Sequence, residues 1–174
     1  ASGAPGHLYW QNRADHVIHV RLDPEVHGVD GTEEITYHNE SPDALRYLWM
    51  QLDQNRHAPD SRANLSRRGP DMDQPQSIGW LESFAETLAH PGGTTIHHVK
   101  DGQGQELPFT IVGSMMRIDL PEPLNSGEVF QFEVKWSHRI TPDAIRSRSG
   151  YEILDDGTGL YELAQWFPRM CAYT

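Results

Sequence analysis

Apolar and polar residues alternate with a period of two through most of this 174-residue sequence. The alternation is cleanest over residues 128–136. One face of that segment would carry Phe130, Phe132, Val134 and Trp136, and the other Gln131, Glu133 and Lys135. Because successive side chains of a strand point to opposite faces, the pattern predicts a strand with one face in a core and the other in water.

The same alternation predicts further short strands joined by turns. They cover residues 16–22, 31–38, 45–52, 94–99, 108–112 and 115–120. The cluster Gly28-Val29-Asp30-Gly31 predicts a hairpin between the first two, and the turn at 101–104 predicts that 94–99 pairs with 108–112. We expect residues 1–174 to form a single all-β domain, either a sandwich or a curved pair of sheets.

The segment 45–52 is apolar on both faces. Leu48, Met50 and Leu52 would point one way, and Leu45, Tyr47 and Trp49 the other. A strand without a polar face must be covered on both sides. The cover comes either from this domain or from a partner outside the sequence.

Two segments interrupt the alternation. Residues 54–76 are polar and contain three prolines, so they predict a long loop. Residues 77–89 place Leu81, Phe84 and Leu88 near helical spacing, and they end at His90-Pro91-Gly92-Gly93. This pattern predicts one short helix.

Charge and composition exclude several classes of partner. The net charge of -11 argues against binding nucleic acid through a positive field. No run approaches the roughly 20 apolar residues of a membrane-spanning helix, so no membrane span is expected. Residues 1–6 lack the basic and apolar regions of a signal peptide. The single Cys171 cannot form an internal disulfide.

The residues themselves predict no catalytic group and no metal site in this chain. The ten histidines include the pairs His16/His19 and His97/His98, whose spacing on a strand directs the two side chains to opposite faces. Asp155-Asp156-Gly157 resembles part of a calcium loop but lacks its alternate acidic ligands, so it predicts a turn. No Ser has a nucleophile-elbow pattern, and no Gly-rich phosphate loop precedes a helix.

Three segments in order resemble the N-terminal domain of the gluzincin zinc aminopeptidases, the family of aminopeptidase N and leukotriene hydrolase. Residues 9–55 are similar to the opening of that domain, and "MRIDLPEPLNSGEVFQFEVKWSHRI" (116–140) resembles its Leu-Pro-x-Pro-Leu hairpin. "ELAQWFPRMCAYT" (162–174) resembles the bacterial branch, which has a Gln-Trp-aromatic-Pro run.

The resemblance implies a mostly antiparallel, curved β saddle that docks against a catalytic domain of the same chain. The zinc, the HExxH helix and the other catalytic groups of the family belong to that later domain. We therefore expect no cofactor in this fragment. We expect the sequence to stop before the last strands of the saddle, and the fragment alone to be inactive. The parent protein would be a zinc metallo-aminopeptidase.

The resemblance also implies a substrate-binding segment. In many relatives a Gln-x-Glu or Gln-x-Gln stretch of the saddle holds the free α-amine at the substrate peptide's N-terminus. Gln165 aligns with the first Gln, whereas Phe167 occupies the position of the second polar residue. Gln165 and Glu162 are therefore the candidates for amine binding. Trp166 and Phe167 are the candidates for the wall of a side-chain pocket. Alternatively, these two aromatic residues belong to the core and Glu162 is only solvated.

A second function is open at this point. The chain would then be a stand-alone β-sandwich module that binds carbohydrate or protein through tryptophans such as Trp10 and Trp49. A zinc motif downstream of Thr174 in the gene would favour the peptidase, and a stop codon the module. The localisation is unknown from the residues, and the bacterial resemblance favours a periplasmic or other extracytoplasmic site.

Overall fold

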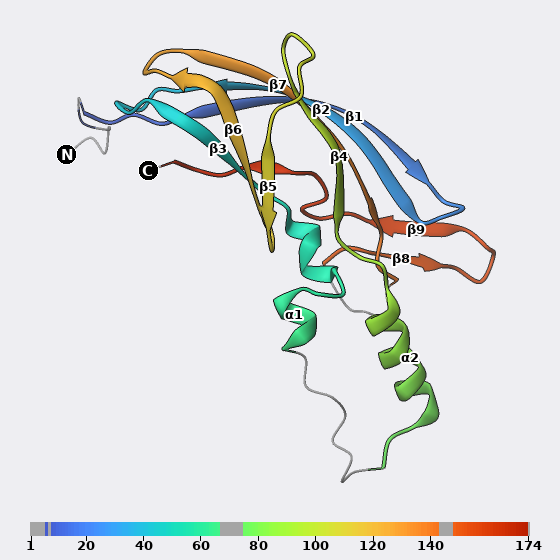
Figure 1. Cartoon of the computed structure of the whole chain (residues 1–174). Coiled ribbons are helices and arrows are strands. Elements are labelled where there is room, and N and C mark those ends of the chain that lie inside the picture. Colours follow the sequence, from blue (N-terminus) through green and yellow to red (C-terminus); the bar gives the residue numbers. More distant parts are fainter. Residues whose placement is uncertain (1–5, 7, 67–74, 143–147, 174) are drawn as a thin grey trace.

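The computed structural model describes residues 6, 8–66, 75–142 and 148–173, which form a curved β structure with a small helical projection (Figure 1). In this part of the chain, one sheet has the order β1-β2-β7-β4 and a second the order β10-β3-β6-β5, while β8 and β9 form a hairpin. All pairs of neighbouring strands are antiparallel. The bounds are β1 Arg13–Asp23, β2 Gly28–His38, β3 Leu45–Gln51, β4 Thr94–Asp101, β5 Phe109–Val112, β6 Met115–Leu124, β7 Val129–Arg139, β8 Gly150–Ile153, β9 Gly159–Glu162 and β10 Arg169–Met170. The expectation of an all-β fold is confirmed.

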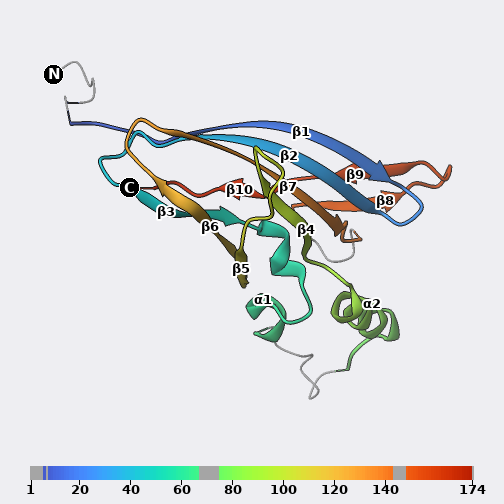
Figure 2. The same ribbon diagram turned by 45° about the horizontal axis from the view of Figure 1, so that its top comes forward.

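The core lies between the two larger sheets. Figures 1 and 2 show β3, β6 and β5 on one side of the curved layer of β1, β2 and β7. The alternation predicted for β7 is confirmed, since Phe132, Val134 and Trp136 are buried. Other fully buried apolar side chains come from both sheets; they include Val29, Ile35, Met50, Val99, Met116 and Ile118. The predicted β1–β2 hairpin is also confirmed.

The strand β3 has one buried face and one open face. The register with β6 shifts between Leu45 and Tyr47. This bulge turns Leu45 to the core side with Leu48, so the prediction that Leu45 shares a face with Tyr47 and Trp49 is wrong. Tyr47 and Trp49 remain 43% and 36% exposed, and the guanidinium of Arg117 lies 4.3 Å from the centre of the Tyr47 ring. Within the described residues, the outer face of β3 is therefore only partly covered.

The strand β5 belongs to the sheet opposite β4. It pairs with β6, so the predicted pairing of 94–99 with 108–112 is wrong. The chain leaves β4 through a single bridge, Lys100 to Glu106, and then buries Leu107 in the core. Pro108 has no N–H for a ladder, which helps the chain cross to the other layer.

The helical projection contains more helix than the sequence predicted. The segment expected to be a loop contains a 3-10 helix, η1 Asp53–His57, and a four-residue helix, α1 Arg62–Leu65; residues 67–74 lie outside the described part. The predicted helix is confirmed as α2 Ile78–Ala89, whose N-cap Ser77 accepts a hydrogen bond from the Trp80 amide. Phe84 is half-buried, Leu81 is exposed, and the side chain of Leu88 lies outside the described part. No described helix is long and apolar enough to cross a bilayer.

Candidate functional site

The predicted substrate-binding residues lie on the segment that leads from β9 to β10. Glu162 is the last residue of β9 and is exposed. Gln165 is also exposed, and its φ of 52° lies in the left-handed region, which L-residues other than Asn, Asp and Gly rarely adopt. The two polar candidates therefore both face solvent.

The two aromatic candidates pack inward. The ring of Trp166 lies 5.8 Å from that of Trp136 on β7 and 5.1 Å from that of Phe167. Phe167 meets the ring of His16 on β1 edge-on at 5.9 Å. Both aromatic side chains are half-buried at the border of the core, so they anchor the segment to the β1–β2–β7–β4 sheet and leave part of each ring accessible.

Three side chains from distant elements hold the backbone of this segment. The Gln54 amide nitrogen donates to the carbonyl oxygens of Ala164 and Gln165, at 3.2 and 3.1 Å. The Ser149 hydroxyl donates to the Ala164 carbonyl at 2.8 Å and accepts from the Ala164 amide at 2.7 Å. Nε2 of His138 donates to the carbonyl of Trp166 at 3.0 Å. The segment is thus bound at three consecutive carbonyl groups and at the amide of Ala164.

These three supporting residues were missed by the sequence reasoning. His138 occupies an inward position of the alternating pattern of β7, so a polar residue at a core position was a usable signal. Burial lowers its pKa, opposed by the hydrogen bonds to the carbonyls of Arg139 and Trp166. Gln54 and Ser149 carried no such signal, because nothing local in the sequence indicates which carbonyls they contact.

A buried carboxylate lies behind the segment. Glu33 on β2 is completely buried, and its Oε2 is 3.4 Å from Nδ1 of His16, the residue that touches Phe167. Burial raises the pKa of Glu33, and the contact with His16 opposes that rise. Its second oxygen, Oε1, and the indole nitrogen of Trp136 are both buried without a hydrogen-bond partner in the part that the structure describes.

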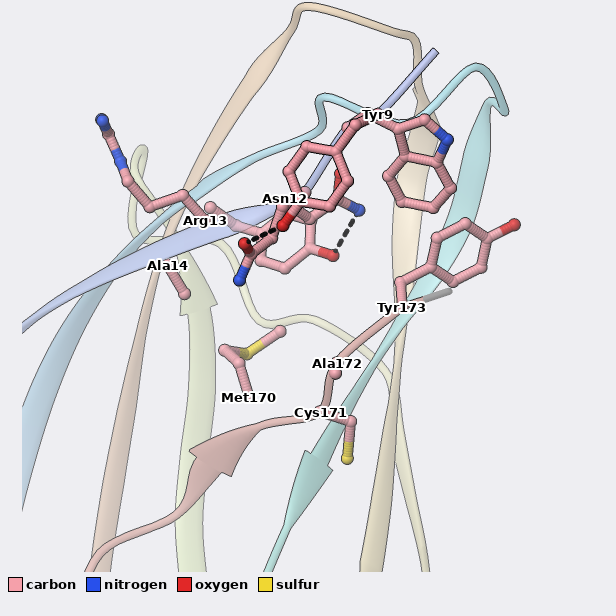
Figure 3. Close-up of a pocket in the computed structure, with 11 residues that line it drawn as sticks. Tyr9, Asn12, Arg13, Ala14, Met170, Cys171, Ala172 and Tyr173 are labelled. Atoms are coloured by element: carbon pink, nitrogen blue, oxygen red, sulfur yellow. Dashed lines mark hydrogen bonds between the residues drawn. The ribbon is translucent and has the colours of Figure 1, made fainter. Parts of the chain in front are cut away.

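Two cavities flank the segment Met170–Tyr173. The first, of about 550 Å³, lies against residues 9–14 and the Tyr37 ring (Figure 3). In this view Tyr9 and Asn12 face Met170 and Tyr173 across the cavity. Asn12 donates to the Tyr37 hydroxyl at 3.0 Å, and the rings of Trp10 and Tyr173 are 5.9 Å apart. The second, of about 380 Å³, is bordered by β3.

The described residues contain no group of three or more His, Cys, Asp and Glu side chains placed to hold a metal ion. His16 is half-buried and His19 is exposed, which confirms that they lie on opposite faces. The turn predicted at Asp155-Asp156-Gly157 is confirmed: Gly157 has a φ of 83°, and the Asp156 carboxylate accepts from the Thr158 amide.

No protein-family model and no curated protein matches the sequence. Two solved structures are similar to the chain: a mutant M1 zinc metallopeptidase from Deinococcus radiodurans, and a mutant two-domain M1 zinc metallopeptidase bound to L-arginine. The TM-scores are 0.46 and 0.45, and the sequence identity is 12% in both cases. Each match covers 80% of this chain and 24% of the other, so the chain spans about a quarter of the length of these proteins.

Proposed function

We propose that this chain is the non-catalytic N-terminal domain of a zinc-dependent aminopeptidase-like metallopeptidase. In that enzyme it forms one wall of the substrate cleft and docks the catalytic domain. The supporting sequence evidence is the ordered resemblance of residues 9–55, 116–140 and 162–174 to this family. The observation that carries the proposal is the segment 162–167, which presents two polar side chains to solvent on a backbone held by hydrogen bonds.

The proposed role of this segment is recognition of the substrate's free N-terminus. A peptide α-amine is a cation near neutral pH, and the Glu162 carboxylate and the Gln165 amide oxygen are both acceptors that suit it. The partly accessible rings of Trp166 and Phe167 would border the first side chain of the peptide. The net charge of -11 favours the approach of a cationic group.

In the proposed enzyme, the catalytic domain would hold the zinc, as the resemblance to the family implies. When bound there, it polarises the scissile carbonyl and activates water. The groups of this chain bind and orient the peptide and exclude water from one side of the cleft. We expect the 174-residue chain alone neither to bind zinc stoichiometrically nor to hydrolyse aminoacyl arylamides.

The outer face of β3 is the proposed contact with the catalytic domain. Tyr47 and Trp49 lie edge to face, with ring centres 6.2 Å apart, and both rings are more than a third exposed. Covering apolar surface stabilises a contact by about 25 cal/mol per Å². A neighbouring domain packed on this face would bury the apolar side chains of β3 that this chain leaves partly exposed.

The test uses the full-length protein and the sequence of its gene. We expect an HExxH zinc motif downstream of Thr174 and zinc-dependent hydrolysis of aminoacyl arylamides by the full-length protein. Glu162→Ala and Gln165→Ala should each raise KM by about ten-fold, the effect of losing a hydrogen bond to a charged group. Glu152→Ala, which removes an exposed carboxylate from the same β8–β9 hairpin, is the control. A stop codon directly after Thr174, or hydrolysis by the 174-residue chain alone, would refute the proposal.

The cavity in Figure 3 favours the second candidate, a module that binds carbohydrate or protein. Its lining includes the rings of Tyr9, Trp10 and Tyr173 and the Asn12 side chain, a combination of aromatic and polar groups suited to a sugar ring. Retention of this chain on an immobilised polysaccharide, lost in Trp10→Ala and kept in Trp80→Ala on the distant α2, would support the module.

A further inference from the structure

The backbone conformation of Gln165 needs support from outside its own segment. Among the described residues, Gln165 and His27 are the two with positive φ that are not glycine. A left-handed conformation places Cβ close to the backbone and is unfavourable for Gln. The two peptide groups that flank its Cα accept hydrogen bonds from residues outside the segment.

Gln54 supplies this support. Its single amide nitrogen binds the carbonyl oxygens of Ala164 and Gln165, which belong to the two peptide groups that flank the Gln165 Cα. Fixing both peptide groups fixes the φ and ψ angles between them. The direction of the Gln165 side chain follows from those two angles.

The position of Gln54 suits this role. It lies in η1, directly after β3, and it is only 7% exposed. A buried glutamine needs hydrogen-bond partners, and the partners of its amide nitrogen are the two carbonyl groups 110 and 111 residues later in the chain. These hydrogen bonds therefore join the helical projection to the segment between β9 and β10.

We propose that Gln54 is a positioning residue for recognition of the substrate's N-terminal amine: by holding Gln165 in the left-handed conformation, it aims the Gln165 side chain, together with Glu162, at the cleft. This inference rests on the proposed function and adds a residue from a different part of the chain. Ser149 shares the Ala164 carbonyl with Gln54, and His138 binds the next carbonyl, that of Trp166; Gln54 contacts the carbonyls on both sides of the Gln165 Cα.

The first experiment measures the backbone φ of Gln165 by NMR couplings in the 174-residue chain. Gln54→Leu keeps the approximate volume but removes the amide, and Gln54→Asn keeps the amide on a shorter side chain. Gln51→Leu is the matched control, since the Gln51 amide contacts the Asp53 carboxylate and no carbonyl of the segment. We expect Gln165 to leave the positive-φ region in Gln54→Leu and to keep it in Gln51→Leu. If Gln54→Leu does not fold, Gln54→Asn gives the same test, because its shorter side chain withdraws the amide from the two carbonyls and Gln165 should again leave the positive-φ region.

The second experiment measures kcat and KM of the full-length protein with an aminoacyl arylamide. We expect Gln54→Leu to raise KM by about ten-fold, as Gln165→Ala does, with kcat changed less than two-fold. Adding Gln54→Leu to Gln165→Ala should then cause little further change, because both act through the same side chain.

The outcomes separate the two proposals. A positive φ at Gln165 that persists in Gln54→Leu and Gln54→Asn overturns the positioning role. So does an unchanged KM in Gln54→Leu when Gln165→Ala raises it, and in that case the proposed amine site stands. If neither Gln165→Ala nor Glu162→Ala changes KM, the proposed amine site itself is refuted, and the positioning role with it.

Discussion

The contact between Gly31 and Trp136 allows a stability prediction worked from distances. These residues are paired across β2 and β7, and the indole ring lies against the glycine. A Cβ atom added at Gly31 would lie 2.3 Å from Cζ2 and 2.6 Å from Cε2 of Trp136. Non-bonded carbon atoms normally stay about 3.5 Å or more apart, so Gly31→Ala must displace the ring by roughly 1 Å.

The ring has little room to move. Trp136 is fully buried, and the centres of the His138 and Trp166 rings each lie 5.8 Å from the centre of its ring. Overpacking of this kind typically destabilises a core by 1–3 kcal/mol, and we expect about 3 kcal/mol for Gly31→Ala because ring atoms rather than a flexible chain end are hit. For a domain of this size that corresponds to a fall in Tm of about 6–12 °C.

Thermal unfolding followed by circular dichroism gives the measurement. Gly79→Ala is the control: a Cβ there meets no atom within 4 Å, and alanine favours the helix α2, so Tm should stay the same or rise slightly. Trp136→Phe shortens the ring, and Gly31→Ala should be less destabilising in that background. A Tm of Gly31→Ala within 2 °C of the wild type would show that the packing argument is wrong.

Three further predictions concern buried polar groups. Burial raises the pKa of Glu33 above its ordinary 4.5, so the native state holds the proton more tightly and stability falls as pH rises above 4.5. Glu33→Gln should remove this dependence and raise the free energy of unfolding by about 1 kcal/mol at pH 7 in urea titrations; equal pH profiles of variant and wild type would contradict it. Burial lowers the pKa of His138 below 6.5, so stability should be lost as pH falls through and below that value. His138→Gln should weaken the loss in urea titrations at pH 5 and pH 7. The buried Asn39 donates to the carbonyls of Asp43 and Leu124 and accepts from Ser41, and Asn39→Ala should destabilise by about 3 kcal/mol in the same titrations; a loss below 1 kcal/mol would refute the role given to these bonds.

The parts of the fold that depend on nearby residues could be predicted from the sequence. The β1–β2 hairpin follows from the alternation, although its turn lies at 24–27 and the predicted turn cluster 28–31 is the start of β2. The helix α2 follows from helical spacing after Ser77. The errors concern partners far away in the chain. The face of Leu45 depends on a bulge against β6, and the sheet that contains β5 depends on where Leu107 is buried.

In the candidate site, too, the residues within one short run could be predicted from the sequence, and the residues that reach it from elsewhere could not. Glu162 and Gln165 could be selected because the resemblance covers a short contiguous run. Gln54, Ser149 and His138 reach the segment from 110, 15 and 28 residues away, as counted from the carbonyl that each contacts. Contacts at such separations leave no periodic pattern in a single sequence. Only the buried polar position of His138 in an alternating strand indicated that something had to be bound there.

The pairing of β10 with β3 has a consequence for synthesis. Arg169 binds Asp53 from a position 116 residues later, so the sheet that contains β3 has no fourth strand until most of the chain has left the ribosome. During that interval Met50 and Gln51 lack their β10 partners, and a nascent chain with such a strand exposed is prone to aggregate. We therefore expect folding yield in the cell to depend on chaperone capacity and on the rate at which the segment between β3 and β10 is translated.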